Sequence, residues 1–232
     1  MDYLHQRPDV AGRGEAFRRP DGRLFLSIDT WNQADFALLA ADMLPALPRP
    51  LYTVVDEADT DLRSCWESAG FTARRREGEY VVPTAPGPVP VLPGVTIGPP
   101  SDERALRSLE DAIRAEVSAT VGWAEMPAEI LPRPDVLDLT KYTVAESGGD
   151  YVGLLRLAAV PRQPRIGLLA VRADRQRAGI GRALLTHVLD ALHRKGVQAA
   201  TAEVHEANSA AVALFEGAGA RRVGGNVELV LR

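Results

Sequence analysis

The feature that most constrains this chain is an apolar segment followed by a glycine-spaced loop and an amphipathic helix. Leu168–Val171 is typical of a buried β-strand, and a helical pattern begins near Ile180, flanked by Gly179 and Gly181. Because glycine has no Cβ, the backbone there can approach a ligand closely. The first amides of a helix lack intrahelical partners and lie at the positive end of its dipole. The pattern predicts a phosphate or pyrophosphate site at the start of this helix.

Two arginines, Arg177 and Arg182, add positive charge beside these amides. The loop lacks the Lys and Ser or Thr that end a P-loop, because Arg182-Ala183 follows Gly181. It also lacks the third glycine of a dinucleotide fingerprint, since Leu184 occupies that position. A tight β-to-α turn without a ligand remains the alternative interpretation.

The segment Gln176-Arg177-Ala178-Gly179-Ile180-Gly181 resembles motif A of the GNAT superfamily of acetyl-CoA-dependent N-acetyltransferases. That motif reads Gln or Arg, two residues, Gly, one residue, then Gly or Ala. A later family signature is also similar to Glu203-Val204, Asn208, Phe215 and Ala218-Gly219. The resemblance covers residues 95–232 well and 23–83 weakly. It implies an α/β fold with a mixed sheet, the GNAT acyl-CoA N-acyltransferase fold, in the order β-α-α-β-β-β-α-β-α-β-β.

The resemblance further implies acetyl-CoA as co-substrate and no metal. In the family, the strand corresponding to Leu168–Val171 diverges from the one corresponding to Ala199–Val204, and the pantetheine arm lies in the gap. The loop and helix start would then hold the pyrophosphate, and Asn208 would contact the arm. The residues expected to bind the coenzyme are Leu169, Ala170, Val171, Gln176, Arg177, Ala178, Gly179, Ile180, Gly181, Arg182, Asn208 and Phe215.

The chemistry that the resemblance implies is direct attack of an amine on the thioester. It needs a deprotonated amine, donors for the developing oxyanion and, often, an acid for the leaving thiolate. Many family members have Tyr where this chain has Phe215, which has no proton to donate. Either another donor acts, or the thiolate leaves with help from water and backbone. Ile166–Val171 contains no carboxylate, so Glu203 is the candidate general base. A solvated or salt-bridged strand carboxylate is the alternative for Glu203.

The acceptor site is expected to involve Trp123 and Glu125, in the region that roofs this site in the family, and Glu228 on the last strand. Such glutamates would favour a cationic amine. The alternatives are a core position for Trp123 and solvated carboxylates at Glu125 and Glu129.

Composition excludes several classes of protein. A net charge of -4 and a pI of 5.6 argue against nucleic acid or an anionic membrane as partner. The single cysteine, Cys65, excludes an internal disulfide and a cysteine-cluster metal site, which fits a cytoplasmic protein. Asp35, Asp42 and Pro45 interrupt the longest apolar run, so no membrane span is expected. The polar, arginine-rich segment Met1–Arg19 does not resemble a signal peptide.

A proline-rich stretch divides the chain. Five prolines fall within eleven positions, namely Pro83, Pro86, Pro88, Pro90 and Pro93, and such a stretch forms neither helix nor central strand. We therefore expect an N-terminal arm at 1–22, a degenerate partial GNAT-like domain at 23–83, a linker at 84–94 and a catalytic GNAT domain at 95–232.

An internal repeat supports this division. Val55–Thr60 aligns without a gap on Val204–Ser209, and Trp66–Gly70 aligns on Phe215–Gly219 at the same offset. We expect a tandem arrangement in which the N-terminal half is truncated and lacks its first strands. Where motif A should fall, this half has Thr30–Asp35, whose carboxylate would repel a pyrophosphate, so it is expected to bind no coenzyme. Its expected role is structural, in closing a sheet edge or walling the acceptor pocket, and unpaired edges favour a homodimer.

Three functions remain open from the sequence. The leading hypothesis is transfer of an acetyl group from acetyl-CoA to a primary amine of a small molecule. The alternatives are a catalytically silent acyl-CoA-binding or sensing protein, suggested by Phe215 and the missing strand carboxylate, and a protein N-acetyltransferase.

Overall fold

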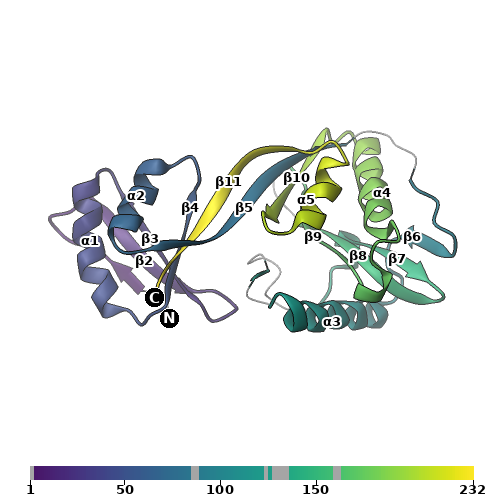
Figure 1. Ribbon diagram of the computed structural model, residues 1–232, viewed down its shortest axis with the longest axis horizontal. Helices are drawn as coiled ribbons and strands as arrows, with labels where there is room; N and C mark the ends of the chain where they lie inside the picture. Colours follow the sequence, from purple (N-terminus) through teal and green to yellow (C-terminus); the bar gives the residue numbers. More distant parts are fainter. Residues whose placement is uncertain (1–2, 85–88, 123–124, 127–135, 159–162) are drawn as a thin grey trace. The chain divides into compact units, whose positions relative to one another are not determined.

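The chain folds into two compact units, which a computed structural model describes over residues 3–84, 89–122, 125–126, 136–158 and 163–232. The first unit comprises Met1–Gly78 together with Gly224–Arg232, and the second comprises Glu79–Val223 (Figure 1). The last residues therefore return to the first unit, whereas the sequence predicted one continuous domain from 95 to 232. Two long strands, β5 (Thr72–Pro83) and β11 (Arg221–Leu231), contribute residues to both units.

The first unit is a sheet with two helices on one face. Its strand order is β1-β2-β3-β4-β11-β5, in which β3 and β4 are parallel and β1, β2 and β11 run antiparallel to their paired neighbours. The other elements are β1 (Tyr3–His5), β2 (Gly12–Arg18), β3 (Leu24–Thr30), α1 (Gln33–Ala46), β4 (Leu51–Asp56) and α2 (Thr60–Ser68).

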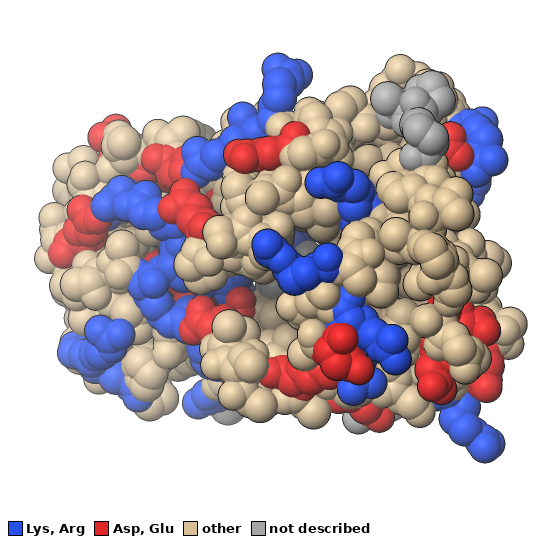
Figure 2. Space-filling model, turned by 45° about the vertical axis from the view of Figure 1, so that its right-hand side comes forward, with Lys and Arg blue, Asp and Glu red and all other residues tan. Residues whose placement is uncertain are grey.

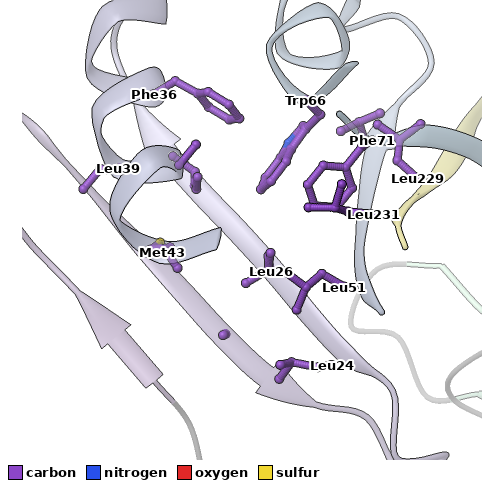
Figure 3. Close-up of a cluster of buried hydrophobic side chains, with 14 of the residues drawn as sticks. Leu24, Leu26, Phe36, Leu39, Met43, Leu51, Trp66, Phe71, Leu229 and Leu231 are labelled. Carbon is purple, nitrogen blue, oxygen red and sulfur yellow. The ribbon is translucent and has the colours of Figure 1, made fainter. Parts of the chain in front are cut away.

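Aromatic packing holds the two helices to this sheet. The Trp66 ring lies edge-on to Phe36 and Phe71, with ring centroids 4.9 and 4.8 Å away, and all three side chains are buried (Figure 3). Leu229 and Leu231 of β11 join the same core. The C-terminal strand is therefore part of the first unit's hydrophobic core.

In the region expected to be an arm, 1–22, the described residues include the strands β1 and β2. A tight turn joins β2 to β3: Gly22 N donates to Arg19 O at 2.8 Å, and Arg19 N donates to Arg23 O at 2.9 Å. Gly22 has φ +83°, a conformation that glycine adopts without strain. The Pro20-Asp21-Gly22 sequence favours such a turn and was the signal for this hairpin.

The sequence repeat is also a repeat of structure. Asp59 caps α2 by accepting from Leu62 N at 3.0 Å. In the second unit, 149 residues later, Asn208 caps α5 (Ser209–Glu216) by accepting from Ala211 N at 3.1 Å. The hydrogen bonds that close the two helices correspond in the same way: Phe71 N to Trp66 O, and Ala220 N to Phe215 O. In the second unit, the strands Tyr142–Ser147 and Asp150–Ala158 precede the strand Arg165–Val171, which corresponds to β3. In the first unit, β1 and β2 precede β3 in the same way, so this unit is less truncated than expected.

The second unit has helices on both faces of its sheet. Its strand order is β5-β10-β9-β8-β7-β6, with β9 and β10 parallel. Helices α4 and α5 bury one hydrophobic cluster and α3 buries another, against alternate residues of the strands (Figure 1). The single strand β11 replaces the two expected final strands. The remaining elements are β6 (Val95–Gly98), α3 (Glu103–Thr120), η2 (Leu139–Lys141), β7 (Tyr142–Ser147), β8 (Asp150–Ala158), β9 (Arg165–Val171), η3 (Ala173–Arg175), α4 (Ile180–Arg194) and β10 (Ala199–His205).

Candidate functional site

The parallel strands β9 and β10 separate toward the end of β9. Their register contains only the pairs Arg165 with Thr201 and Ile166 with Ala202 within the described chain. On its other side, β9 stays paired with β8 as far as Val171. The backbone of Leu169–Val171 is thus paired on one side and leaves a gap on the side of β10. An extended ligand could add to this open edge as a strand does.

The start of α4 faces no capping side chain. Gly179 is the N-cap residue, with φ +83°, and no side-chain hydrogen bond caps the helix there. The first intrahelical bond runs from Ala183 N to Gly179 O at 3.0 Å, so the preceding amides lie ahead of it. The first turn contains no acidic residue. This end of the helix therefore has the free amides and positive dipole end that bind an anion.

The two glycines of the loop have different roles. Gly179 needs its left-handed backbone, whereas a Cβ at Gly181 would meet the side chains of Leu169 and Leu214 at 3.5 and 3.6 Å, which is ordinary contact. Arg177 also has a positive φ of 64°, which is uncommon for a residue with a Cβ. Gln176 holds the loop to the strand by donating from Nε2 to Val171 O at 3.2 Å. The predicted motif residues are thus continuous in the structure: Gln176–Gly179 end the loop after β9, and Ile180 and Gly181 begin α4.

The first unit lacks this loop. Two residues, 31 and 32, separate β3 from α1, whereas 172–179 separate β9 from α4. Asn32 caps α1 by accepting from Asp35 N at 2.9 Å, so a side chain occupies the place that a phosphate would take. That no coenzyme binds there remains a prediction, which this difference supports.

A glutamate that the sequence analysis missed holds the start of the second unit's loop. Glu116 of α3 forms an ion pair with Arg172, with Oε1 and Nε 2.6 Å apart, and its Oε2 accepts from Ala173 N at 2.9 Å. The hydrogen bond from Arg172 to Glu116 raises the pKa of the arginine. Leu106, Leu109 and Ile113 form the buried stripe of α3 at helical spacing, but helical periodicity cannot pair Glu116 with a loop far along the chain.

The other predicted coenzyme residues differ in exposure. The Asn208 side-chain oxygen is engaged in capping α5, and its amide nitrogen has no protein partner within the described chain. Ile180 and Phe215 are buried in the core cluster of α4 and α5, at 4% and 5% exposure. Their contact with coenzyme stays a prediction.

The candidate base is ion-paired. Glu203 of β10 accepts from Arg165 of β9, with Oε2 and Nη2 2.8 Å apart, and both side chains are partly exposed. The guanidinium thus occupies one side of the carboxylate that would have to accept the proton. The salt-bridged alternative for Glu203 is therefore present in the structure, and its role in catalysis remains a prediction.

A second carboxylate, that of Glu110, lies on the buried face of α3. Glu110 is 6% exposed and accepts from the hydroxyl of Tyr142 at 2.8 Å. Burial raises the pKa of Tyr142, and the hydrogen bond to Glu110 adds to this shift, while Arg156 opposes it. This buried pair was also missed, because residue types alone do not reveal burial.

The predicted acceptor residues fall in different parts of the chain. Trp123 and Glu129 lie outside the described residues. The backbone N of Glu125 donates to Gly122 O at 3.1 Å. Glu228 belongs to the first unit, where it is 7% exposed and ion-paired with Arg23 at 2.9 Å and with Arg74. A shared acceptor site for these residues stays a prediction.

The described residues also bear on other kinds of site. Among them there is no group of three or more His, Cys, Asp or Glu side chains that could hold a metal. None of their helices is long and apolar enough to cross a membrane. On the face shown in Figure 2, blue basic and red acidic side chains lie side by side.

A pocket of about 490 Å³ lies in the first unit, between α1 and α2. Its walls include Phe36, Ala40, Leu44, Cys65 and Ser68. The pocket is separate from the glycine-spaced loop, which belongs to the second unit.

Comparison with known proteins matches part of the second unit to a protein family. Residues 109–220 match the model of the Acetyltransferase (GNAT) family. The [Ribosomal protein bS18]-alanine N-acetyltransferase of Escherichia coli (strain K12) is 49% identical over 51 residues, 22% of this chain and 34% of that protein. The chain therefore spans about a third of the length of the curated relatives it matches.

Solved structures share the fold. The GCN5-related N-acetyltransferase from Sphaerobacter thermophilus has a TM-score of 0.68 at 18% identity, covering 95% of this chain and 76% of that one. A tandem GNAT protein from the clavulanic acid biosynthesis pathway has a TM-score of 0.66 at 14% identity, covering 99% and 83%. The predicted mixed-sheet GNAT fold is confirmed, and the chain carries, over residues 109–220, an acetyltransferase domain of the GNAT family.

Proposed function

We propose that the second unit transfers the acetyl group of acetyl-CoA to a primary amine by direct attack. The observation that carries this proposal is the gap between β9 and β10, which leads into the uncapped start of α4. An acyl-pantetheine arm paired with Leu169–Val171 would place its pyrophosphate at the loop before α4. One ligand would then use both the strand edge and the helix dipole.

The chemistry would be carried by few groups. The coenzyme supplies the acetyl thioester, and backbone amides beside the gap could stabilise the developing oxyanion. Glu203 is the proposed base, acting directly or through water, and would have to accept a proton despite its pairing with Arg165. Phe215 cannot protonate the leaving thiolate, so water or another donor would do so.

The acceptor that we propose is a small-molecule amine. A second candidate is the N-terminal amine of a protein. It is supported by the Escherichia coli relative, 49% identical over 51 residues, which is an alanine N-acetyltransferase of ribosomal protein bS18. A panel of small amines and a panel of peptides with free or blocked N-termini would separate the two. Turnover of only the free peptides would reject the small-molecule acceptor.

The test of the proposal is calorimetric titration of the whole protein with acetyl-CoA and with free CoA, followed by these panels. We expect saturable binding of both nucleotides and release of free CoA with at least one amine. Absence of binding would reject the coenzyme site. Binding without turnover across both panels would favour the silent acyl-CoA-binding alternative.

We also propose a cellular compartment and an oligomeric state for this protein. The single cysteine supports a cytoplasmic protein. The short strand β1, with Leu4 61% exposed, ends the sheet of the first unit and offers an edge for a homodimer. Light scattering during size-exclusion chromatography would show the mass of the assembly.

A further inference from the structure

One face of the first unit's sheet carries a row of aromatic side chains in register. Phe17 of β2 lies opposite Phe25 of β3, which lies opposite Tyr52 of β4. Successive rings stack at centroid distances of 6.2 and 5.4 Å. Side chains alternate along a strand, and the neighbours Leu24, Leu26 and Leu51 belong to the core under α1 and α2. The aromatic row therefore lies on the face away from these helices.

Arginines cover this row. The Arg19 guanidinium carbon lies 3.5 Å from the centroid of the Phe25 ring, and that of Arg23 lies 5.3 Å from it. The β2–β3 turn places both arginines beside the row, two positions along the chain from Phe17 and Phe25, because Arg19 and Arg23 pair through their backbones across it. Phe25 is 1% exposed, while the neighbouring ring of Phe17 is 39% exposed.

The arginines differ in their partners. Arg23 donates to Asp21 at 2.5 Å and to Glu228 at 2.9 Å, and Arg74 also donates to Glu228. Within the described chain, the Arg19 guanidinium makes no hydrogen bond or ion pair. Burial lowers the pKa of Arg19, and the negative charge of Glu228 opposes this shift. A guanidinium that lies flat on a ring keeps its N–H donors at its edge, available for a planar acceptor.

We propose that Arg19 is the centre of a binding site for a small monocarboxylate with an apolar or aromatic body. The guanidinium fork matches the two oxygens of a carboxylate, and the exposed ring of Phe17 offers an apolar surface beside it. The site lies wholly in the first unit, apart from the proposed coenzyme loop, and does not depend on acetyl transfer.

Charge balance favours a monoanion over a dianion. The cluster contains the guanidinium groups of Arg19, Arg23 and Arg74 and the carboxylates of Asp21 and Glu228, a formal net charge of +1. The nearby Glu77 is neutralised by its ion pair with Arg75. One carboxylate would neutralise the cluster, whereas a phosphate dianion would leave it negative beside two fixed carboxylates.

The probe that we choose is benzoate, with benzamide as its uncharged match and inorganic phosphate as the dianion. The ¹⁵N-labelled full chain would be titrated with each at pH 7.5, and dissociation constants would be read from the backbone amides of Arg23 and Phe25. We expect saturable shifts with benzoate, binding of phosphate at least about tenfold weaker, and no saturation with benzamide.

The variants Arg19→Gln and Arg19→Lys test the assignment. Loss of a charge-assisted hydrogen-bonded pair should weaken benzoate binding about tenfold or more in Arg19→Gln. Arg19→Lys keeps the charge without the fork and should fall between that variant and the wild type. Arg13→Gln, at an exposed position of β2, is the matched control and should bind as the wild type does.

Benzoate binding that is absent, or unchanged in both Arg19 variants, would overturn the proposal. Equal binding of benzamide, or tighter binding of phosphate, would overturn the ligand class. Because the titration is made without coenzyme, these outcomes are distinguishable from failure of acetyl-CoA to bind.

Discussion

Glu116 and Arg172 join the end of α3 to the start of the glycine loop, with a carboxylate oxygen 2.6 Å from the guanidinium Nε. The other oxygen of Glu116 accepts from the next backbone amide, Ala173 N. One side chain thus fixes both the charge and the backbone where β9 becomes loop. Placement of the phosphate-binding amides should depend on a residue that does not touch the phosphate.

The first prediction concerns this clamp. Glu116→Gln keeps the shape of the side chain but removes its charge, so the loop should be held less firmly, and the dissociation constant for acetyl-CoA should rise about three- to tenfold. Glu103→Gln is the matched control, because Glu103 pairs with Arg107 on the surface of the same helix. Calorimetric titration of both variants checks this, and equal affinities would show that the clamp does not position the loop.

The second prediction compares the two glycines that flank α4. Gly179 and Gly196 have φ of +83° and +79°, so a Glu at either position should cost similar backbone strain, about 1–2 kcal/mol. Gly179→Glu also adds a carboxylate at the uncapped helix start and should weaken acetyl-CoA binding at least about 100-fold. Gly196→Glu, at the other end of the helix, should bind acetyl-CoA normally. If the two variants bind alike, the anion is not held at this helix start.

The third prediction separates catalysis from structure at Glu203. If Glu203 is the base, Glu203→Gln should lower kcat by about 100-fold or more and leave acetyl-CoA affinity unchanged. Arg165→Gln removes an ion-pair partner of Glu203 but keeps the carboxylate, and should lower kcat much less. If the pair is only structural, both variants should lower Tm alike and keep kcat. Steady-state kinetics with an acceptor from the panel, and thermal unfolding, distinguish these results.

The fourth prediction concerns pH and the buried Tyr142–Glu110 pair. The folded-state pKa of Tyr142 is raised, so this group contributes stability that is fully present below the unfolded pKa of about 10. That stability is lost as pH rises through the folded-state pKa. Tyr142→Phe leaves buried Glu110 without this donor and should cost about 1–3 kcal/mol at pH 7. The variant should lose less stability than the wild type between pH 9 and 11, measured by urea unfolding. An equal loss would contradict the assignment.

The fifth prediction concerns the core of the first unit. Trp66→Ala removes a ring packed against Phe36 and Phe71 and should cost about 3–5 kcal/mol. Trp31 is 92% exposed, so Trp31→Ala should change stability by less than about 0.5 kcal/mol. Urea unfolding of the two variants provides the comparison.

The sequence predicted the local parts of this molecule well. The spacing of Gly179 and Gly181 after an apolar run predicted the strand, loop and helix, because backbone freedom and apolar periodicity are local properties. The alignment of Val55–Thr60 on Val204–Ser209 predicted that the two segments correspond. They do correspond, since each leads into a capped helix, and helix capping is also a local property.

Pairings across the chain were not predictable in this way. The ion pair of Glu116 with Arg172 spans 56 positions, and that of Glu228 with Arg23 spans 205. The sequence predicts that Glu228 lies on a strand but does not predict the neighbours of that strand. Its pairing with β4 joins residues far apart in the chain, which no local pattern in β11 indicates.

The pairing of β11 with β4 has a consequence during synthesis on the ribosome. Asn226–Leu231 lies against Leu51–Asp56, so a strand that the first unit needs is translated after all of the second unit. Domains of most proteins fold in the order in which they emerge. Here the unit that emerges first must wait, with β4 unpaired on that side, until the second unit and β11 have been translated. The nascent first unit thus exposes an open sheet edge while the second unit is being made.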